Sequence, residues 1–266
     1  MAGPRRDTRG IVDAPELFAQ VRFRRREPAA GLRTYIEHYW LIDWDLSQPY
    51  ASHVVPHPSV NLVFQRFEGE ADFAEVSGIG LELFTQKLEG RGRVCGVQFR
   101  PGGFRPFAPD RPVAEWTGQR LLADEAFTPP APPSDILGPA DEDARVAALD
   151  RYLLALGPEP DPQAERAMAL ADLVRTDRTV RRVDELAHAA GLSPRSLQRL
   201  FAAYVGVGPK WVILRYRIHE ALERAESDPR VDWAALAAEL GYSDQAHLIR
   251  DFTATVGVPP TAFAPH

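Results

Sequence analysis

The chain has 266 residues, 45% of them hydrophobic and 26% charged, the composition of an ordinary globular protein with material for two hydrophobic cores. The net charge is −6, and its distribution along the chain is uneven. The single cysteine, Cys95, fits a reducing cytoplasm and excludes an internal disulfide. No run approaches the roughly 18 apolar residues that a membrane span requires, and no charged start leads into an apolar signal core. We therefore expect neither a membrane protein nor a secreted one.

Short apolar runs broken by glycine, proline and aspartate fill the region from about residue 32 to residue 122. Residues 60–64 and 93–99 have the composition of strands, and residues 100–104, with Pro-Gly-Gly at their centre, predict a tight turn. Short strands with such breaks predict a β-rich domain over residues 11–128, folded as a small β-barrel or sandwich with a few helices.

The middle of the chain predicts a connection between two domains. Residues 129–139 hold five prolines in eleven positions, which favours a loop or a domain boundary. Residues 141–156 carry apolar side chains at helical spacing behind an acidic start, as the helix dipole favours. We therefore assign residues 129–164 to a linker with a connecting helix and residues 165–264 to an all-helical domain, which makes the chain an α+β protein.

One pattern occurs twice in the last hundred residues. The stretch at 186–193, Leu-Ala followed by Gly-Leu-Ser, recurs 50 residues later at 236–243 as Leu-Ala followed by Gly-Tyr-Ser. The Val-Gly-Val segment at 205–207 recurs at 256–258, now 51 residues later. One residue has therefore been inserted between the two matches, within residues 243–252.

Each copy predicts a helix-turn-helix unit, the first over residues 183–201 and the second over residues 231–252. A glycine in the left-handed conformation ends the first helix of each unit, and a serine two residues later caps the second helix. These positions are Gly191 and Ser193 in the first unit and Gly241 and Ser243 in the second. Residues 209–227 predict one long helix that spaces the two units for successive major grooves, about 34 Å apart along DNA.

The outward face of each second helix carries side chains able to read base edges, since Arg can bond guanine and Gln adenine bidentately. The predicted contact residues are Arg195, Ser196, Gln198 and Arg199 in the first unit, Lys210 in the long helix, and Asp244, Gln245, His247 and Arg250 in the second unit. Residues 186–219 hold five basic residues and no acidic one, whereas residues 220–266 hold three basic residues against eight acidic ones. We therefore expect the first unit to grip DNA phosphates more strongly than the second.

Residues 165–264 resemble the C-terminal DNA-binding domain of the AraC/XylS family of bacterial transcription regulators. The matching stretches are the repeated segments at 186–201 and 236–252 and the Val-Gly-Val-Gly-Pro-Lys segment at 205–210. The resemblance implies binding to double-stranded promoter DNA and control of transcription initiation, with RNA polymerase as a candidate further partner. The sequence departs from the family in the acidic residues around its second recognition helix.

Residues 30–125 more loosely resemble an uncharacterised β-rich domain that precedes this module in some family members, through the stretches at 38–40, 56–64 and 96–104. The resemblance implies a cupin-like barrel that binds a small-molecule effector or forms a homodimer. The candidate pocket residues are Trp40, Trp44, Phe64, Phe99 and Arg100. Aromatic residues of a small barrel more commonly form its core, and an arginine such as Arg100 is more commonly ion-paired or solvated.

Other chemistry finds little support in the sequence. His53 and His57 lack the His-x-His spacing of a cupin metal site, so we expect no metal and no cofactor. Cys95 has no basic neighbour that would form a thiolate, which favours an inert thiol. One alternative is a DNA-binding module fused to a DNA-modifying or repair enzyme, for which we identify no catalytic residues; another is a purely architectural front domain, which a fully packed interior would favour. We predict a regulator and not an enzyme.

Overall fold

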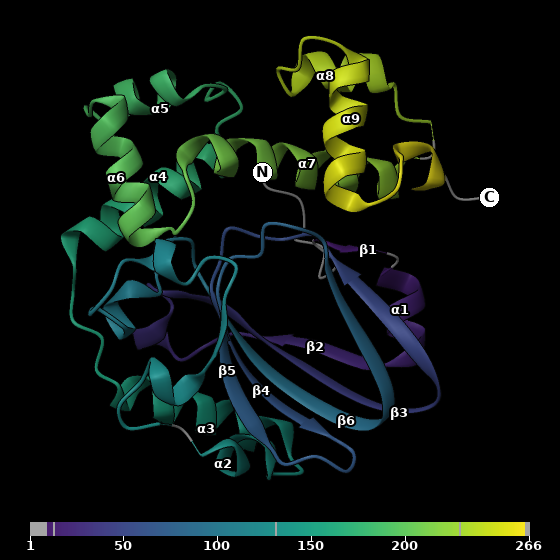
Figure 1. Ribbon diagram of the computed structural model, residues 1–266, viewed down its shortest axis with the longest axis vertical. Helices are drawn as coiled ribbons and strands as arrows, with labels where there is room; N and C mark the ends of the chain where they lie inside the picture. The colour runs from purple at the N-terminus through teal and green to yellow at the C-terminus, as the bar shows by residue number, and fades with distance from the viewer. Residues whose placement is uncertain (1–9, 13, 131, 229, 264–266) are drawn as a thin grey trace.

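The computed structural model describes residues 10–12, 14–130, 132–228 and 230–263, and it has a β-rich first half followed by helices (Figure 1). The strands are β1 (Ile11–Val12), β2 (Arg22–Arg26), β3 (Ile36–Val54), β4 (Asn61–Phe67), β5 (Phe73–Ser77), β6 (Phe84–Phe99) and β7 (Arg120–Leu122). The α-helices are α1 (Ala14–Gln20), α2 (Pro133–Leu137), α3 (Glu142–Ala155), α4 (Pro162–Thr176), α5 (Val183–Ala189), α6 (Pro194–Tyr204), α7 (Pro209–Ser227), α8 (Trp233–Glu239) and α9 (Gln245–Val256). Short 3-10 helices are η1 (Ala30–Leu32), η2 (Arg105–Phe107), η3 (Val113–Glu115), η4 (Ala123–Glu125) and η5 (Pro260–Phe263). The predicted α+β class is confirmed.

The strands form one sheet in the order β1-β3-β6-β4-β5-β7, and β2 also pairs with β3. The long strands β3 and β6 pair antiparallel from Ile36 opposite Phe99 to Val54 opposite Phe84, and shorter neighbours cover only parts of them. In the described part of the chain, β1 and β7 each pair with a single neighbour. The sheet is therefore open, and the predicted barrel describes it only loosely, because closure requires its two edges to pair with each other.

Side chains along β3 alternate between two buried faces of the sheet, as the two-residue period of a strand requires. Tyr39 and Leu41 belong to the larger core, which also contains residues of α2 and α3. Trp40 and Ile42 belong to a separate cluster that contains residues of α1. The sheet is thus packed on both sides, by α1 on one and by α2 and α3 on the other.

An ion-pair network fastens α3 to the sheet through the carboxylate of Asp43. Arg93 Nε lies 2.6 Å and Arg145 Nη1 3.0 Å from Asp43 Oδ1, and Arg24 pairs with the other oxygen. Burial alone would raise the pKa of Asp43, but the hydrogen bonds from Arg145, Arg24 and Arg93 hold it well below its usual range. The connecting helix that we predicted is therefore tied to β2, β3 and β6.

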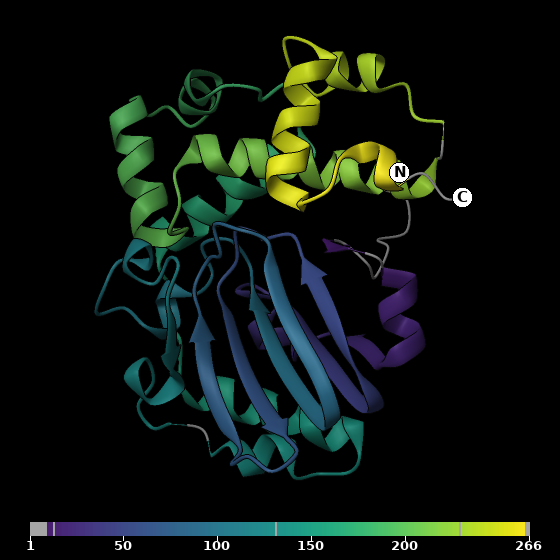
Figure 2. The same ribbon diagram turned by 45° about the vertical axis from the view of Figure 1, so that its right-hand side comes forward.

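Helices α4 to α9 stack on one end of the sheet, with α7 lying between α5 and α6 on one side and α8 and α9 on the other (Figures 1 and 2). The larger core runs from the sheet into the first helix-turn-helix unit, since it includes Phe99 and Phe104 together with Leu197 and Phe201. A second core joins α7, α8 and α9 to the front half through residues such as Val55. The domain boundaries that we propose divide the sequence, but side chains from both regions pack together in the same two cores.

Candidate nucleic-acid interface

The first helix-turn-helix unit consists of α5, a glycine turn and α6. Gly191 has a φ of 62°, the left-handed conformation that glycine adopts without steric cost. The Ser193 hydroxyl accepts a hydrogen bond from the backbone N–H of Ser196 at 3.1 Å and so caps α6. Leu197 and Phe201 are fully buried, which leaves the opposite face of α6 directed to solvent.

The second unit, α8 and α9, has the same turn but a different cap. Gly241 has a φ of 74°. The residue that caps α9 is Asp244, whose carboxylate accepts a hydrogen bond from the backbone N–H of His247 at 2.8 Å. Our assignment of Ser243 as the cap is therefore corrected by one position; its hydroxyl instead lies 3.1 Å from the Asp244 carboxylate.

This cap places the inserted residue within the turn. Leu192 and Tyr242 stand 50 residues apart, and each donates its backbone N–H to the carbonyl five residues before it, at 2.9 Å. The caps Ser193 and Asp244 stand 51 residues apart, so Ser243 is the insertion. The equivalent pairs on the two recognition helices are therefore Arg195 and Ala246, Ser196 and His247, Gln198 and Ile249, and Arg199 and Arg250. Counting backwards from the buried Leu and Phe of each helix would have located the insertion from the sequence.

The predicted contact residues differ in how available they are. The exposed ones are Arg195, Gln198, Arg199, Lys210, Gln245 and Arg250, and Ser196 is half-buried. Asp244 is exposed, but its carboxylate bonds the start of its own helix. His247 is half-buried, with its ring 5.1 Å from that of Tyr242 and its Nε2 3.7 Å from Asp251. The first recognition helix thus presents two exposed arginines, and the second presents one.

Arg215, which the sequence counts among the basic residues of the first unit, is not available to DNA. It is 8% exposed, its guanidinium lies 4.4 Å from the ring centre of Trp211, and its Nη2 lies 3.5 Å from the carbonyl oxygen of Leu81 in the front domain. Burial lowers its pKa to about 10. Arg217 is half-buried against Tyr242, so the phosphate-binding charge of residues 186–219 rests on Arg195, Arg199 and Lys210.

The predicted effector residues do not line one pocket, because they lie on opposite faces of the sheet. Phe64 and Phe99 are fully buried in the larger core, and Trp40 and Trp44 belong to the cluster on the other face. Trp40 lies flat against Gly96, where an added Cβ would come within 2.0 Å of the indole. All four aromatic residues are packing residues, as the more common reading of a small β-domain predicts.

Arg100 forms an ion pair with Asp172 of α4 and donates a hydrogen bond to the Thr34 carbonyl at 3.1 Å. It borders a surface hollow of about 290 Å³ that is lined by Glu27, Pro28, Arg33, Ile36, Glu37, Arg100 and Arg175. Because acidic residues stand beside the arginines, this hollow has little excess positive charge. Arg100 joins the front domain to the helical region.

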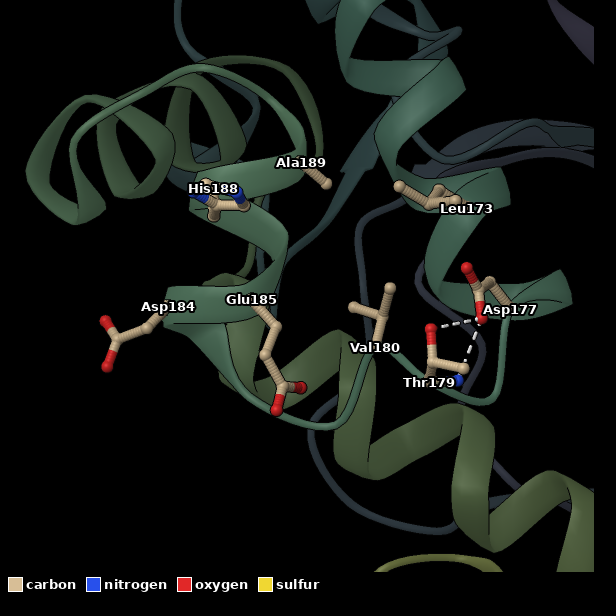
Figure 3. Close-up of a pocket in the computed structure, with 8 residues that line it drawn as sticks. All are labelled: Leu173, Asp177, Thr179, Val180, Asp184, Glu185, His188 and Ala189. Atoms are coloured by element: carbon tan, nitrogen blue, oxygen red, sulfur yellow. Dashed lines mark hydrogen bonds between the residues drawn. The ribbon is translucent and has the colours of Figure 1, made fainter.

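A larger surface hollow, of about 520 Å³, lies between α4 and α5 (Figure 3). Leu173 and Val180 point into it, whereas the Asp184 carboxylate points away. At its edge, Thr179 donates hydrogen bonds to the Asp177 carboxylate, from its backbone N–H at 2.8 Å and from its hydroxyl at 2.7 Å. The hollow is an open groove between α4 and the first unit, and none of the predicted contact residues line it.

The remaining reactive residues are engaged in local contacts. His53 bonds Thr85 and His57 bonds Ser59, and the described residues include no group of three or more His, Cys, Asp or Glu placed to hold a metal ion. Burial raises the pKa of the Cys95 thiol to about 11, which keeps it protonated at neutral pH. Within the described residues, no helix has the length and apolar character needed to cross a membrane.

Two family models match the chain, one in the β-rich front half and one in the C-terminal helices. Residues 186–265 match the family described as "Helix-turn-helix domain", of the AraC type, and residues 24–122 match the family described as "Domain of unknown function (DUF6597)". No curated protein sequence matches the chain.

Among solved structures, the chain is similar to ToxT from Vibrio cholerae, at 9% identity and a TM-score of 0.43, over 85% of this chain and 97% of that one. It is also similar to ToxT bound to an unsaturated fatty acid, at 12% identity and a TM-score of 0.41, over 98% and 97% of the two chains. A third structure, ToxT bound to (E)-4-(8-methylnaphthalen-1-yl)but-3-enoic acid, matches at 11% identity and a TM-score of 0.43, over 96% of each chain.

Proposed function

We propose that this protein, whose C-terminal region is an AraC-type helix-turn-helix domain, regulates transcription by placing α6 and α9 in successive major grooves of promoter DNA. The observation that carries the proposal is the repeated turn and cap geometry at Gly191 and Gly241. Both recognition helices begin on the side of the molecule far from the sheet and end near it (Figure 1). Their first turns, which carry the base-reading side chains in such units, therefore face away from the front domain.

The two units contribute unequally in this proposal. Arg195 and Arg199 are exposed on α6, so the first unit can pair with guanine edges or with phosphates. In the second unit Asp244 is used as a cap, which leaves Gln245 and Arg250 as the side chains that reach DNA. The first unit supplies most of the affinity, and the second adds sequence information and register.

In this proposal the front domain positions the DNA-binding units. Its inward aromatic side chains are packed in cores, so they do not line a pocket for an effector. A small-molecule effector bound at its surface, or a homodimer formed through it, would act by shifting that arrangement. RNA polymerase is the partner expected at an occupied promoter. The protein would act as a cytoplasmic regulator without catalytic activity of its own.

Binding of the purified protein to the DNA upstream of its own coding sequence, titrated across salt concentration, tests the proposal. We expect saturable binding that resists competitor DNA, with a log–log salt slope of roughly −2.7 to −3.6, because about three or four phosphates are neutralised. Binding that nonspecific competitor DNA removes completely, at every salt concentration, would refute a sequence-reading regulator of that region.

Variants of the first recognition helix assign the contact residues. Arg195→Ala and Arg199→Ala should each weaken binding by about 1–3 kcal/mol where the arginine contacts a base. Arg151→Ala is the matched control, since Arg151 is an exposed arginine on α3, far along the chain from either recognition helix. Operator binding that is unchanged in both α6 variants would show that α6 does not read DNA.

A further inference from the structure

The segment between α4 and α5 lies against the turn of the other helix-turn-helix unit. Arg181, just before α5, donates a hydrogen bond from Nη2 to the carbonyl oxygen of Glu239 in α8 at 3.1 Å. Its aliphatic stem covers Gly241, where an added Cβ would lie 2.8 Å from the Arg181 Cδ. One side chain from the segment that leads into the first unit therefore rests directly on the turn that precedes α9.

A second arginine, Arg217, bonds the backbone of Arg181. Arg217, on α7, donates a hydrogen bond to the Arg181 carbonyl oxygen at 2.6 Å, and its guanidinium lies 5.6 Å from the ring centre of Tyr242. Arg217 is half-buried, and this burial lowers the pKa of its guanidinium. Hydrogen bonds from a charged donor such as a guanidinium are stronger than those between neutral groups.

The Arg181 backbone is itself held in place. The Glu185 carboxylate accepts hydrogen bonds from the backbone N–H of Arg181 at 2.6 Å and of Arg182 at 2.8 Å. The bond from Arg181 is the main cause that lowers the pKa of Glu185. The segment therefore enters α5 in a fixed conformation, and the position of the Arg181 side chain follows from it.

A chain of ion pairs runs alongside these contacts. Arg178 pairs with Glu220 of α7, and Arg224 lies 4.0 Å from Glu220 and 3.6 Å from Glu239. Arg178, Arg224 and Glu239 are exposed and Glu220 is half-buried, so each pair contributes little by itself. These pairs join the segment before α5 to α7, and α7 to α8, which are the same elements that Arg181 and Arg217 join.

Without these contacts, the two units would be joined mainly through α7 and its connections. A single helix keeps two units apart, but the loop from α7 to α8 leaves their relative rotation to be set by packing. Helices α5 and α8 lie on the same side of α7 in both views (Figures 1 and 2). Both units already pack on α7, and Arg181 adds a direct link between them on that side, which restricts their relative rotation further.

We propose that Arg181, held by Arg217 and Glu185, is a positioning residue that fixes the relative orientation of α6 and α9 and thereby the spacing of the two DNA half-sites that one chain accepts. This inference rests on the proposed function, because it concerns how the same two helices share one DNA molecule. We refer to Arg181, Arg217 and Glu239 as the bracket.

The bracket can be tested in the full chain without DNA. Nitroxide labels are placed on cysteines introduced at exposed Gln198 of α6 and Ala254 of α9, since the native Cys95 is buried. We expect Arg181→Ala to broaden the distribution of distances between the labels by about two-fold, as local restraint is lost. Arg181→Lys retains the stem and one donor and should broaden it less.

Arg182→Ala is the matched control for this measurement, because it removes the same charge from the neighbouring exposed residue while keeping the backbone bond to Glu185. It should leave the distribution unchanged. Equal distributions in the parent protein and Arg181→Ala, or equal broadening by Arg181→Ala and Arg182→Ala, would overturn the bracket whether or not the protein binds DNA.

The consequence for DNA is tested with duplexes. The parent protein first enriches a duplex from a random pool, and footprinting locates its two half-sites. One base pair is then inserted between these half-sites. The insertion rotates the second half-site by about 34°, and we expect it to weaken binding by the parent protein at least about 30-fold, since most contacts of one unit are lost. Arg181→Ala should bind the original duplex about five-fold more weakly, because the effective concentration of the second unit falls.

The decisive quantity is the ratio of the two dissociation constants. In Arg181→Ala the inserted base pair should cost only about three-fold, because the loosened units can follow the new spacing. A loss of affinity by Arg181→Ala with the same 30-fold penalty would overturn the role in spacing and leave a simple loss of contacts. If the parent protein enriches no sequence, the proposed function fails, while the label distances still decide whether the bracket restrains the units.

Discussion

The two helix-turn-helix units share one turn geometry but differ in what surrounds them. The first unit is docked on the front domain, where Thr117 donates a hydrogen bond to the Gly206 carbonyl at 2.8 Å and Arg105 stacks 4.6 Å from the ring centre of Tyr204. The second unit packs mainly against α7 and η5. The repeat has therefore kept the residues that shape the turn, while the surfaces that hold each unit in the molecule have diverged.

The reading faces have diverged in the same way. Arg199 and Arg250 occupy equivalent positions, but Arg195 is replaced by Ala246 in the second unit. The second unit also begins its recognition helix with a carboxylate where the first begins with a hydroxyl. These differences favour a first unit that supplies affinity and a second that refines the choice of site.

The largest effect should come from the loop that follows each recognition helix. Gly206 and Gly257 are equivalent and have φ values of 95° and 85°, so alanine costs about 1–2 kcal/mol at either. At Gly206 the new methyl group would also lie 2.6 Å from Ile79 Cδ1 and 3.0 Å from Thr117 Oγ1, whereas at Gly257 its nearest neighbour is Leu83 at 3.2 Å. We expect unfolding in urea to show a loss of about 3 kcal/mol or more for Gly206→Ala, with overpacking included, and about 1–2 kcal/mol for Gly257→Ala. Equal losses would contradict the closer docking of the first unit on the front domain.

The equivalent arginines provide the next comparison. Arg199→Ala should weaken binding to the selected duplex by about 1–3 kcal/mol, as expected for a base contact, and Arg250→Ala by less than about 1 kcal/mol. Fluorescence anisotropy with the same duplex at one salt concentration measures both. A larger effect at Arg250 than at Arg199 would reverse the assignment of the two units.

Adding an arginine to α9 at the position equivalent to Arg195 should make the two units more alike in how they bind DNA. Ala246→Arg adds to α9 the charge that Arg195 provides on α6, so the log–log salt slope should steepen by about 0.9 and affinity should rise. Ala147→Arg, at an exposed position of α3, is the control for the change in net charge. A similar change in slope for both variants would mean that overall charge, and not the position on α9, is responsible.

Local rules could predict the turns and the ends of the long helix α7, because these depend on neighbouring residues. The insertion at Ser243 was located only within a range, because serine and aspartate both cap helices and the cap was not counted back from the buried Leu248; the bond from His247 identifies Asp244 as the cap. The faces of Trp40 and Phe64 depend on the register of paired strands, and a one-residue change reverses them. The burial of Arg215 depends on Leu81, which lies 134 residues away in the sequence.

The smallest predicted effect concerns the two caps and their response to pH. Hydrogen bonds from the His247 backbone and the Ser243 hydroxyl lower the pKa of Asp244, so its ionised form stabilises the folded state above the unfolded pKa of about 3.9, and this contribution is lost as pH falls through the lower folded value. Asp244→Asn keeps a capping oxygen but does not titrate. The difference in unfolding free energy between the parent protein and Asp244→Asn should therefore shrink between about pH 5 and pH 3. Ser193→Ala, in the first unit, should cost about 1 kcal/mol at every pH because a hydroxyl does not ionise there. A difference between the parent protein and Asp244→Asn that stays constant across this range would show that the Asp244 carboxylate does not stabilise the second unit through its charge.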